Sequence, residues 1–177
     1  MPSAATILPD PACLQLLRLT ADANTITATV LTTAPSARCP LCGEQAVRVH
    51  SRYTRRLADL PWHGVGLRLV LHVRKFFCDH AACARCVFTE RLPQVVASYA
   101  RRTLRLAHWF MAVGFAAGGA AGARLLRELG VGATAAMVLA RVRAAQCVQS
   151  ATPRVLGVDD FAFRRRRRYG TILVDLE

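Results

Sequence analysis

The chain has 177 residues and a formal net charge of +13, from 24 Lys and Arg against 11 Asp and Glu. Its default partners are therefore polyanions: DNA, RNA or an anionic membrane surface. The N-terminus shows no secretory leader, so nothing favours an oxidising compartment, and a disulfide framework for the seven cysteines is disfavoured. A chain of this length forms one domain of ordinary size or two or three small ones.

The first predicted element is a small β-hairpin within residues 13–32. Leu14 to Leu19 and Ile26 to Leu31 have the composition of strands. Asp22, Ala23 and Asn24 lie between them and supply turn residues.

A pair of cysteines follows the hairpin. Cys39 and Cys42 are separated by two residues, so their thiolates can turn toward one point. A second cluster would complete the four-sulfur shell that Zn²⁺ prefers. Cys78 with Cys83, or Cys83 with Cys86, can form this second pair, and Cys83 belongs to both. The sequence predicts a structural zinc site.

Two strands are predicted between Gln45 and Phe77, each with one apolar and one basic face. In the second, Leu67, Leu69, Leu71 and Val73 alternate with Arg68, His72 and Arg74, and in the first Val47 and Val49 oppose Arg48, His50 and Arg52. The basic faces are either a surface for a phosphate backbone or the solvated side of a two-layer domain. Under the first interpretation the DNA-contacting residues are Arg48, Arg52, Arg68 and Arg74.

From Pro93 the pattern becomes helical. Helices are predicted from Tyr99 to about Phe115, from Ala120 to Leu129 and from Thr134 to about Gln146, with breaks at residues 118–119 and 130–132. Two short helices joined by a glycine-containing turn form the outline of a helix-turn-helix, whose second helix enters the major groove.

The second helix of this pair offers few groups for reading bases. Thr134 is placed to cap its first turn, and Arg141 and Arg143 are its cationic residues. Several alanines accompany them, so direct base contacts would be sparse.

Residues 106–123 carry no formal charge and contain glycines spaced four apart, which also suits a membrane helix. His108 and the pair Gly118-Gly119 argue against a span, because each glycine costs a helix interior up to about 1 kcal/mol. A break between two soluble helices is the preferred interpretation, and a small basic membrane-associated protein is the alternative.

The C-terminal residues predict a second hairpin. Val155 to Val158 forms a strand that ends at Asp159-Asp160, and Tyr169 to Asp175 forms its partner. Asp159 is either a turn or cap residue or a ligand for Mg²⁺, which favours carboxylate oxygens. The five arginines at 164–168 are either a phosphate clamp or a solvated turn.

Several motifs together resemble the N-terminal part of the ISL-three family of bacterial insertion-sequence transposases. They are Cys39-Pro40-Leu41-Cys42-Gly43, Asp59-Leu60-Pro61-Trp62-His63-Gly64, Val73-Arg74-Lys75-Phe76-Phe77-Cys78, Phe88-Thr89-Glu90, Gly118-Gly119-Ala120-Ala121-Gly122 and Gly157-Val158-Asp159-Asp160-Phe161-Ala162. The resemblance begins at about residue 39 and extends to the last residue.

The resemblance implies an α+β chain with a zinc-binding domain, a helix-turn-helix and the start of an RNase H-like domain whose Asp-Asp-Glu triad binds two metal ions. The expected parts are a hairpin segment at 1–38, the zinc-binding domain at 39–92, the helical domain at 93–150, and two strands of an incomplete catalytic domain at 151–177. The family's zinc ligands match Cys39, Cys42, Cys78 and Cys83, with Cys86 as the alternative to Cys83, and its first catalytic aspartate matches Asp159.

These features together predict a cytoplasmic, nucleoid-associated bacterial protein that holds structural Zn²⁺ and binds double-stranded DNA at transposon terminal inverted repeats. We expect a truncated transposase, inactive by itself, that forms homo-oligomers or pairs with a full-length enzyme and does not enter membranes. The alternative is an active strand-transfer enzyme completed by a downstream reading frame or a second chain. Mg²⁺ is expected only where the catalytic domain is completed.

Overall fold

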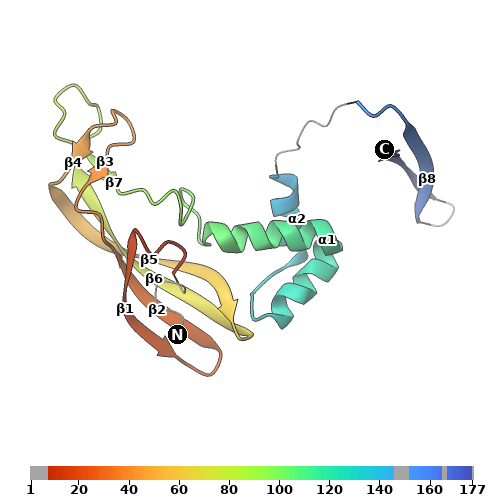
Figure 1. Cartoon of the computed structure of the whole chain (residues 1–177), viewed down its shortest axis with the longest axis horizontal. Helices are drawn as coiled ribbons and strands as arrows, with labels where there is room; N and C mark the ends of the chain where they lie inside the picture. The colour runs from red at the N-terminus through yellow and green to blue at the C-terminus, as the bar shows by residue number, and fades with distance from the viewer. Residues whose placement is uncertain (1–7, 146–151, 165–166, 177) are drawn as a thin grey trace. The chain divides into compact units, whose positions relative to one another are not determined.

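The computed structural model describes residues 8–145, 152–164 and 167–176, which fall into two compact units, Met1–Ala145 and Gln146–Glu177. The first unit contains a β-sheet, a small ribbon of two short strands and a pair of helices, and the second contains a single hairpin (Figure 1). The chain is thus mixed α+β, with a β-rich N-terminal region. The domain boundaries expected from the sequence stay a prediction.

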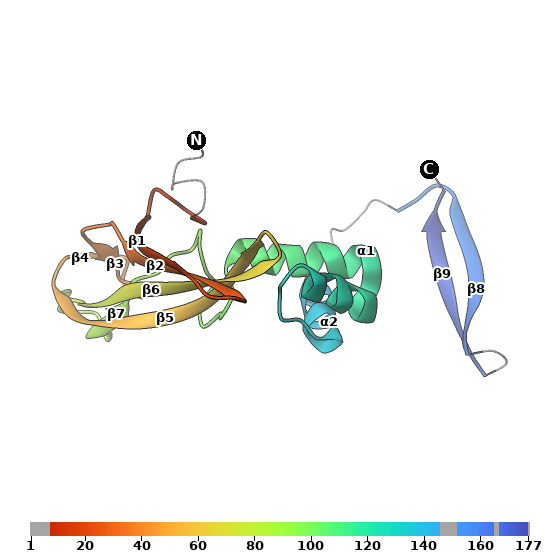
Figure 2. The ribbon, with the colours of Figure 1, turned by 90° about the horizontal axis from the view of Figure 1, so that it is seen from below.

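The sheet places the N-terminal hairpin beside the two longest strands (Figure 2). Its strands are β1 (Leu14–Ala21), β2 (Thr25–Thr32), β6 (Val65–Phe77) and β5 (Val49–Trp62) in spatial order, and β7 (Val87–Thr89) pairs with the far end of β6. The hairpin β1–β2 and the antiparallel pair β5–β6 confirm the predicted strands. The sequence pattern did not predict that β2 runs parallel to β6, in register from Thr25 with Gly66 to Leu31 with His72.

The alternation of β6 sets the inner face of the sheet. Leu69, Leu71 and Val73 are at most 1% exposed, and Ala28 and Val30 of β2 lie beside them in the same core. Burial of such side chains supplies about 25 cal/mol for each Å² of apolar surface removed from water. The predicted apolar face of β6 is therefore confirmed as part of the main core. The apolar face predicted for the strand before it is wrong at Val47, which is 69% exposed and precedes β5, and Val49 packs against the smaller cluster around Phe76.

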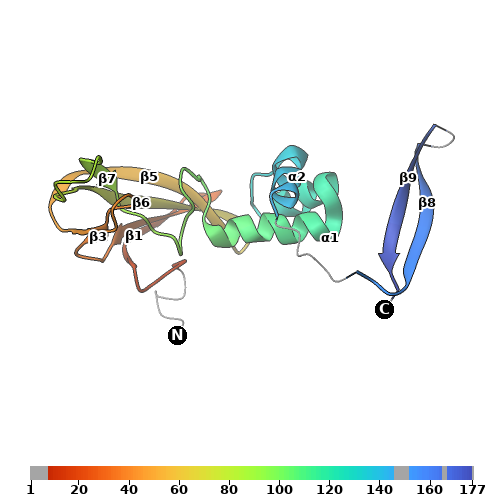
Figure 3. The same ribbon diagram turned by 90° about the horizontal axis from the view of Figure 1, so that it is seen from above.

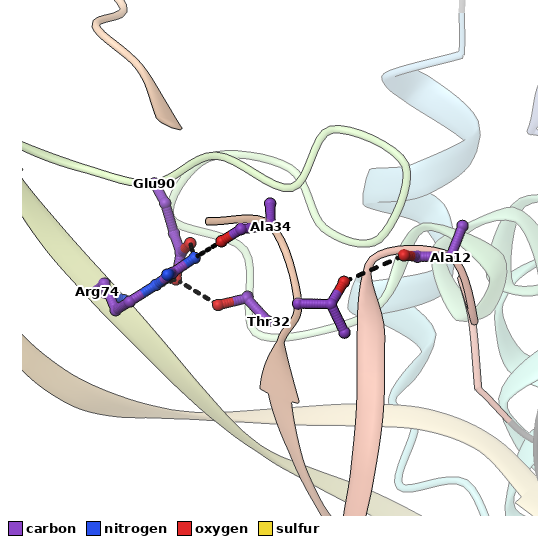
Figure 4. A network of polar contacts seen from close by, with 6 residues as sticks. Ala12, Thr32, Ala34, Arg74 and Glu90 are labelled. Atoms are coloured by element: carbon purple, nitrogen blue, oxygen red, sulfur yellow. Dashed lines mark hydrogen bonds and ion pairs between the residues drawn. The ribbon is translucent and has the colours of Figure 1, made fainter. Parts of the chain in front are cut away.

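A buried carboxylate ties β7 to this sheet (Figure 4). Glu90 accepts hydrogen bonds from Thr32 Oγ1 at 2.9 Å and from the Arg74 backbone amide at 2.7 Å. The Arg74 guanidinium lies 2.8 Å from its second oxygen and also donates to the Ala34 carbonyl. Arg74, Thr32 and Glu90 thus join three segments that are distant in sequence.

Two helices follow, and the first is interrupted. Helix α1 (Leu104–Glu128) contains Gly118 at φ 70°, where the backbone leaves the helical conformation and the axis bends (Figure 1). Helix α2 (Ala135–Arg143) packs against α1 (Figure 3). The predicted break at Gly118 is confirmed, whereas the helix expected from Tyr99 begins later, because Tyr99 has φ 60° and Thr103 caps the first turn.

The glycines of α1 allow α2 to approach closely. A Cβ atom at Gly114 would lie 2.5 Å from a methyl group of Val142, and one at Gly119 would lie 2.7 Å from Leu139. Over its best 18-residue window α1 has a mean hydropathy of 1.3, so by length and composition it could cross a membrane. Core helices of soluble proteins have the same property, and these glycines face a neighbouring helix of this chain.

The end of α1 is closed by a glycine in the left-handed conformation. Val131 donates its amide to the Leu126 carbonyl at 2.8 Å, and Gly130, at φ +80°, donates to Arg127 at 2.9 Å, which is the Schellman arrangement. A Cβ atom at Gly130 would lie 2.2 Å from the backbone oxygen of Gly64, which belongs to the β5–β6 turn.

We therefore expect Gly130→Ala to lower the free energy of unfolding by about 2 kcal/mol or more, through positive φ and a clash with backbone that cannot yield. Gly132→Ala is the matched control, because a Cβ there meets nothing within 4 Å. Its unfolding free energy should stay within about 0.5 kcal/mol of the parent. Urea denaturation of both variants measures this difference, and equal losses would contradict it.

A second buried carboxylate fixes the start of α1 on the sheet. Asp59 of β5, at 2% exposure, accepts a hydrogen bond of 2.6 Å from Thr103 Oγ1 and is paired by Nε and Nη2 of the Arg105 guanidinium. Thr103 also caps the helix by accepting from the Leu106 amide. The aspartate therefore holds the cap and the first turn together.

Replacing Asp59 with Ala leaves the Arg105 guanidinium without its carboxylate in a largely buried site. The expected loss in unfolding free energy is about 3–5 kcal/mol, measured by urea denaturation. Glu128→Ala, at an exposed position near the end of α1, should change stability by less than about 0.5 kcal/mol. A mild effect at Asp59, similar to that at Glu128, would show that the pair contributes little.

The second unit is an antiparallel hairpin of β8 (Leu156–Arg164) and β9 (Arg168–Asp175), which confirms the predicted hairpin. The predicted end of the first strand is wrong, because Asp159 and Asp160 continue β8 and pair with Ile172 and Thr171. Its apolar side chains are exposed, including Val158 and Leu173 at 64% each and Phe163 at 70%. An isolated two-stranded hairpin is marginal in water. Arg165 and Arg166 of the predicted basic turn lie outside the described residues.

Candidate metal centre and nucleic-acid interface

The first half of the metal centre is a knuckle held by two very short strands, β3 (Ala37–Arg38) and β4 (Gln45–Ala46). Cys39 donates its amide to the Glu44 carbonyl at 2.8 Å, and Gly43 donates to the Cys39 carbonyl at 2.9 Å. Gly43 has φ 78°, a conformation that favours glycine. This turn brings Cys39 and Cys42 toward the same point.

The second half follows the end of β6. Cys78 comes directly after this strand, and its amide donates to the Cys86 carbonyl at 2.9 Å. Cys83 donates its amide to the His80 carbonyl at 3.0 Å. The loop therefore folds back on itself and presents Cys78 and Cys83 to the knuckle.

The four thiols converge. The sulfurs of Cys39, Cys42, Cys78 and Cys83 all lie within 4.8 Å of one another, with Cys39 to Cys83 at 3.9 Å and Cys42 to Cys78 at 3.6 Å. Tetrahedral zinc with Zn–S bonds of about 2.3 Å requires S···S separations of about 3.8 Å. The spacing of these sulfurs fits a structural zinc ion.

The protonation of the cluster also suits a cation. Burial raises the pKa of the Cys39 thiol, but hydrogen bonds from the amides of Cys42 and Leu41 outweigh it and lower the pKa to about 6. At Cys78 the amide of His80 lowers the pKa, but burial and the three neighbouring thiols raise it to about 12. A thiolate is therefore favoured at Cys39, while Cys78 retains its proton, which a bound metal would displace.

Cys86 takes a different position. It is exposed, is absent from the four-sulfur cluster and contributes its backbone carbonyl instead. Of the two second pairs that the sequence left open, the structure brings Cys78 and Cys83 to the knuckle.

The centre has a small core of its own. Phe76 and Phe88 are buried beside Cys39 and Ala46, with the two rings stacked at a centroid distance of 6.0 Å. Because β6 carries Phe76 and ends at Phe77, directly before Cys78, the sheet and the metal centre share one strand.

Comparisons with known proteins place this geometry in a family. Residues 35–83 match the zinc finger of the transposases IS204, IS1001, IS1096 and IS1165, a segment that contains all four clustered cysteines and excludes Cys86. The transposase for insertion sequence element IS1001 of Bordetella parapertussis is 33% identical over 146 residues, which cover 81% of this chain. Over this shared region the chain belongs to the ISL-three family of transposases. It spans about a third of the length of the curated relative, and no solved structure matches it.

The basic residues predicted on the sheet of this ISL-three chain divide into two kinds. Arg52 and Arg68 are exposed, on the face opposite the core. Arg48 forms an exposed ion pair with Asp79 and lies 4.0 Å over the Phe77 ring, and Arg74 is held by Glu90. Arg52 and Arg68 are thus more available to an external phosphate than Arg48 and Arg74.

The helical candidates are arranged as the sequence predicts. Thr134 caps α2 by accepting from the Met137 amide at 3.3 Å, and Arg141 and Arg143 lie exposed in its last turn. Burial, and secondly the positive charge of Arg141, lower the pKa of Arg102. Positive potential is therefore concentrated around the C-terminal half of α2.

Asp159 lies inside β8, where it is exposed and opposite Ile172 of β9. Among the described residues, no group of side chains that could hold a metal ion includes Asp159. Asp159 therefore stays a candidate metal ligand through the family resemblance alone.

One basic region was not found from the sequence. An open groove of about 670 Å³ lies between the edge strand β5, the end of β6 and the segment after β7. Its cationic lining residues are Arg55, Arg56, Lys75, Arg85, Arg91 and Arg101. They are scattered through strands and loops, so no single periodic pattern identifies them.

Cys83→Ser should lower the bound zinc to well below one ion per chain and unfold the ribbon, because a hydroxyl replaces a zinc-binding thiolate. Cys86→Ser should retain the parent's zinc, since its side chain lies outside the cluster. Metal content of both purified variants, measured by inductively coupled plasma mass spectrometry, tests the ligand set. Zinc loss in Cys86→Ser with retention in Cys83→Ser would reverse the assignment.

Proposed function

We propose that this chain is a zinc-dependent DNA-binding region of an ISL-three transposase that recognises the terminal inverted repeats of its element. The observation that carries the proposal is the four-cysteine cluster within residues that match a transposase zinc finger. In this proposal Cys39, Cys42, Cys78 and Cys83 hold structural zinc and keep the ends of β3, β6 and β7 together.

Charge and secondary structure support the DNA part of the proposal. The second half of α1 and α2 form the helix-turn-helix, with Thr134, Arg141 and Arg143 directed to the DNA. Arg52 and Arg68 on the exposed sheet face contact backbone phosphates, which give salt-dependent affinity without reading sequence. Arg48 and Arg74 contribute through the segments that they hold in place.

A catalytic role is the second candidate. In this proposal β8 and β9 begin an RNase H-like domain, and Asp159 helps to hold the Mg²⁺ ions of a strand-transfer site that further chain completes. The exposed apolar residues on β8 and β9 favour this role, because strands with such side chains are normally covered by other elements. The protein would then act in the cytoplasm on the nucleoid, as an oligomer or together with a full-length transposase.

The DNA proposal predicts a gel shift with duplex DNA that carries the element's terminal repeat. Binding should weaken steeply with salt, and chelation of zinc should abolish it, because the apo ribbon loses its fold. Arg141→Gln and Arg143→Gln should each reduce the slope of log K against log salt by about 0.9 if each contacts one phosphate.

Arg18→Gln provides the matched control, because Arg18 is an exposed arginine on the outer hairpin strand β1. Its slope should equal that of the parent. Retardation that persists unchanged after metal removal would contradict the zinc-dependent proposal.

A further inference from the structure

The groove between β5, β6 and the segment after β7 combines free positive charge with one fully displayed aromatic ring. We infer that it binds a short unpaired nucleic-acid strand, with phosphates on the groove cations and a base stacked on Tyr99. The inference rests on the proposed DNA-binding function and adds a strand type and a site to it.

The cations that line the groove are not neutralised by ion pairs within the protein. Within the described residues, Arg56, Lys75, Arg85, Arg91 and Arg101 form no ion pair with a carboxylate. The acidic residue in the lining is Glu90, which is buried and already bound by Arg74. Net positive potential therefore remains in the groove, and phosphate is the anion that nucleic acids offer to it.

Tyr99 is displayed at the rim in an unusual way. It lines the groove, the residue is 93% exposed, and its backbone has φ 60°, a conformation uncommon outside glycine. Such a backbone persists where the surrounding structure holds it, and it recurs at functional sites.

The backbone next to Tyr99 is firmly attached to the edge strand. Arg55 donates to the Ala100 carbonyl at 2.7 Å, and Ala58 donates its amide to the Arg101 carbonyl at 2.9 Å. The backbone that carries the ring is thus held in place, which lowers the backbone entropy lost when a base stacks on the ring.

The metal centre controls one wall of the groove. Arg85 follows Cys83 by two residues, and its amide lies 3.4 Å from the Cys83 sulfur, to which it donates. Lys75 of β6 also lines the groove, with its ammonium 5.5 Å from the centre of the Tyr53 ring. The zinc ribbon thereby holds the backbone of one cationic lining residue, Arg85, in place.

The size of the groove favours an unpaired strand over a duplex. A volume of about 670 Å³ falls in the range that encloses small ligands, and one or two nucleotides are of that size. A double helix would present its backbone to the rim and keep its bases away from Tyr99. Grooves that combine cations with an aromatic platform are the usual means of binding single strands.

The test uses the zinc-loaded full chain and a fluorescein-labelled oligothymidine of about ten nucleotides, followed by fluorescence anisotropy. Tyr99→Gly removes the ring and suits the positive φ, so we expect binding about five- to hundred-fold weaker. Tyr99→Phe retains a stacking face and should bind within about two-fold of the parent. Phe115→Ala, which removes an exposed ring on α1, should bind like the parent.

Charge variants separate the groove from the rest of the basic surface. Arg85→Gln and Arg91→Gln should each lower the single-strand salt slope by about 0.7, whereas Arg18→Gln should not change it. Circular dichroism and zinc content of every variant establish that the fold is retained.

Two results would overturn the inference and leave the duplex proposal standing. One is a parent protein that shifts terminal-repeat duplex but does not bind oligothymidine. The other is a folded Tyr99→Gly variant that binds oligothymidine as the parent does. Failure of the parent on both probes would overturn the DNA-binding proposal as well.

Discussion

Convergence of four sulfurs on one point is the constraint on which the β-rich region depends. The knuckle at Cys39 and Cys42 is held by strands of two residues each, and a two-stranded ribbon is at best marginally stable by itself in water. The other two thiols come from the end of β6 and from the loop before β7. A zinc ion bound there joins the ribbon to the longest strands of the sheet, and the buried pair of phenylalanines adds a small apolar core around it.

Two buried carboxylates extend this order beyond the metal. Glu90 fastens the end of β7 to β2 and β6, and Asp59 fastens the start of α1 to β5. Both occur in motifs that resemble ISL-three transposases, and the contacts explain why these residue types stand there.

Local patterns were sufficient for much of the fold. Alternation predicted the faces of β6, glycine and threonine predicted the bend in α1 and the cap of α2, and cysteine spacing predicted the knuckle. The spacing alone did not choose between Cys83 and Cys86, because that choice depends on how the loop after β6 folds back. The parallel pairing of β2 with β6 and the groove beside Tyr99 depend on contacts between distant segments, which no local period encodes.

The parallel pairing of β2 with β6 has a consequence for how a nascent chain matures on the ribosome. The hairpin β1–β2 is translated before β6, the strand that pairs with β2, and the knuckle and β5 lie between them in the sequence. Cys39 and Cys42 are likewise translated before Cys78 and Cys83, which complete the zinc site. Pairing of β2 with β6 and binding of zinc by all four cysteines therefore become possible at nearly the same stage of synthesis. Until then the earlier segments are exposed to proteases and to chaperones.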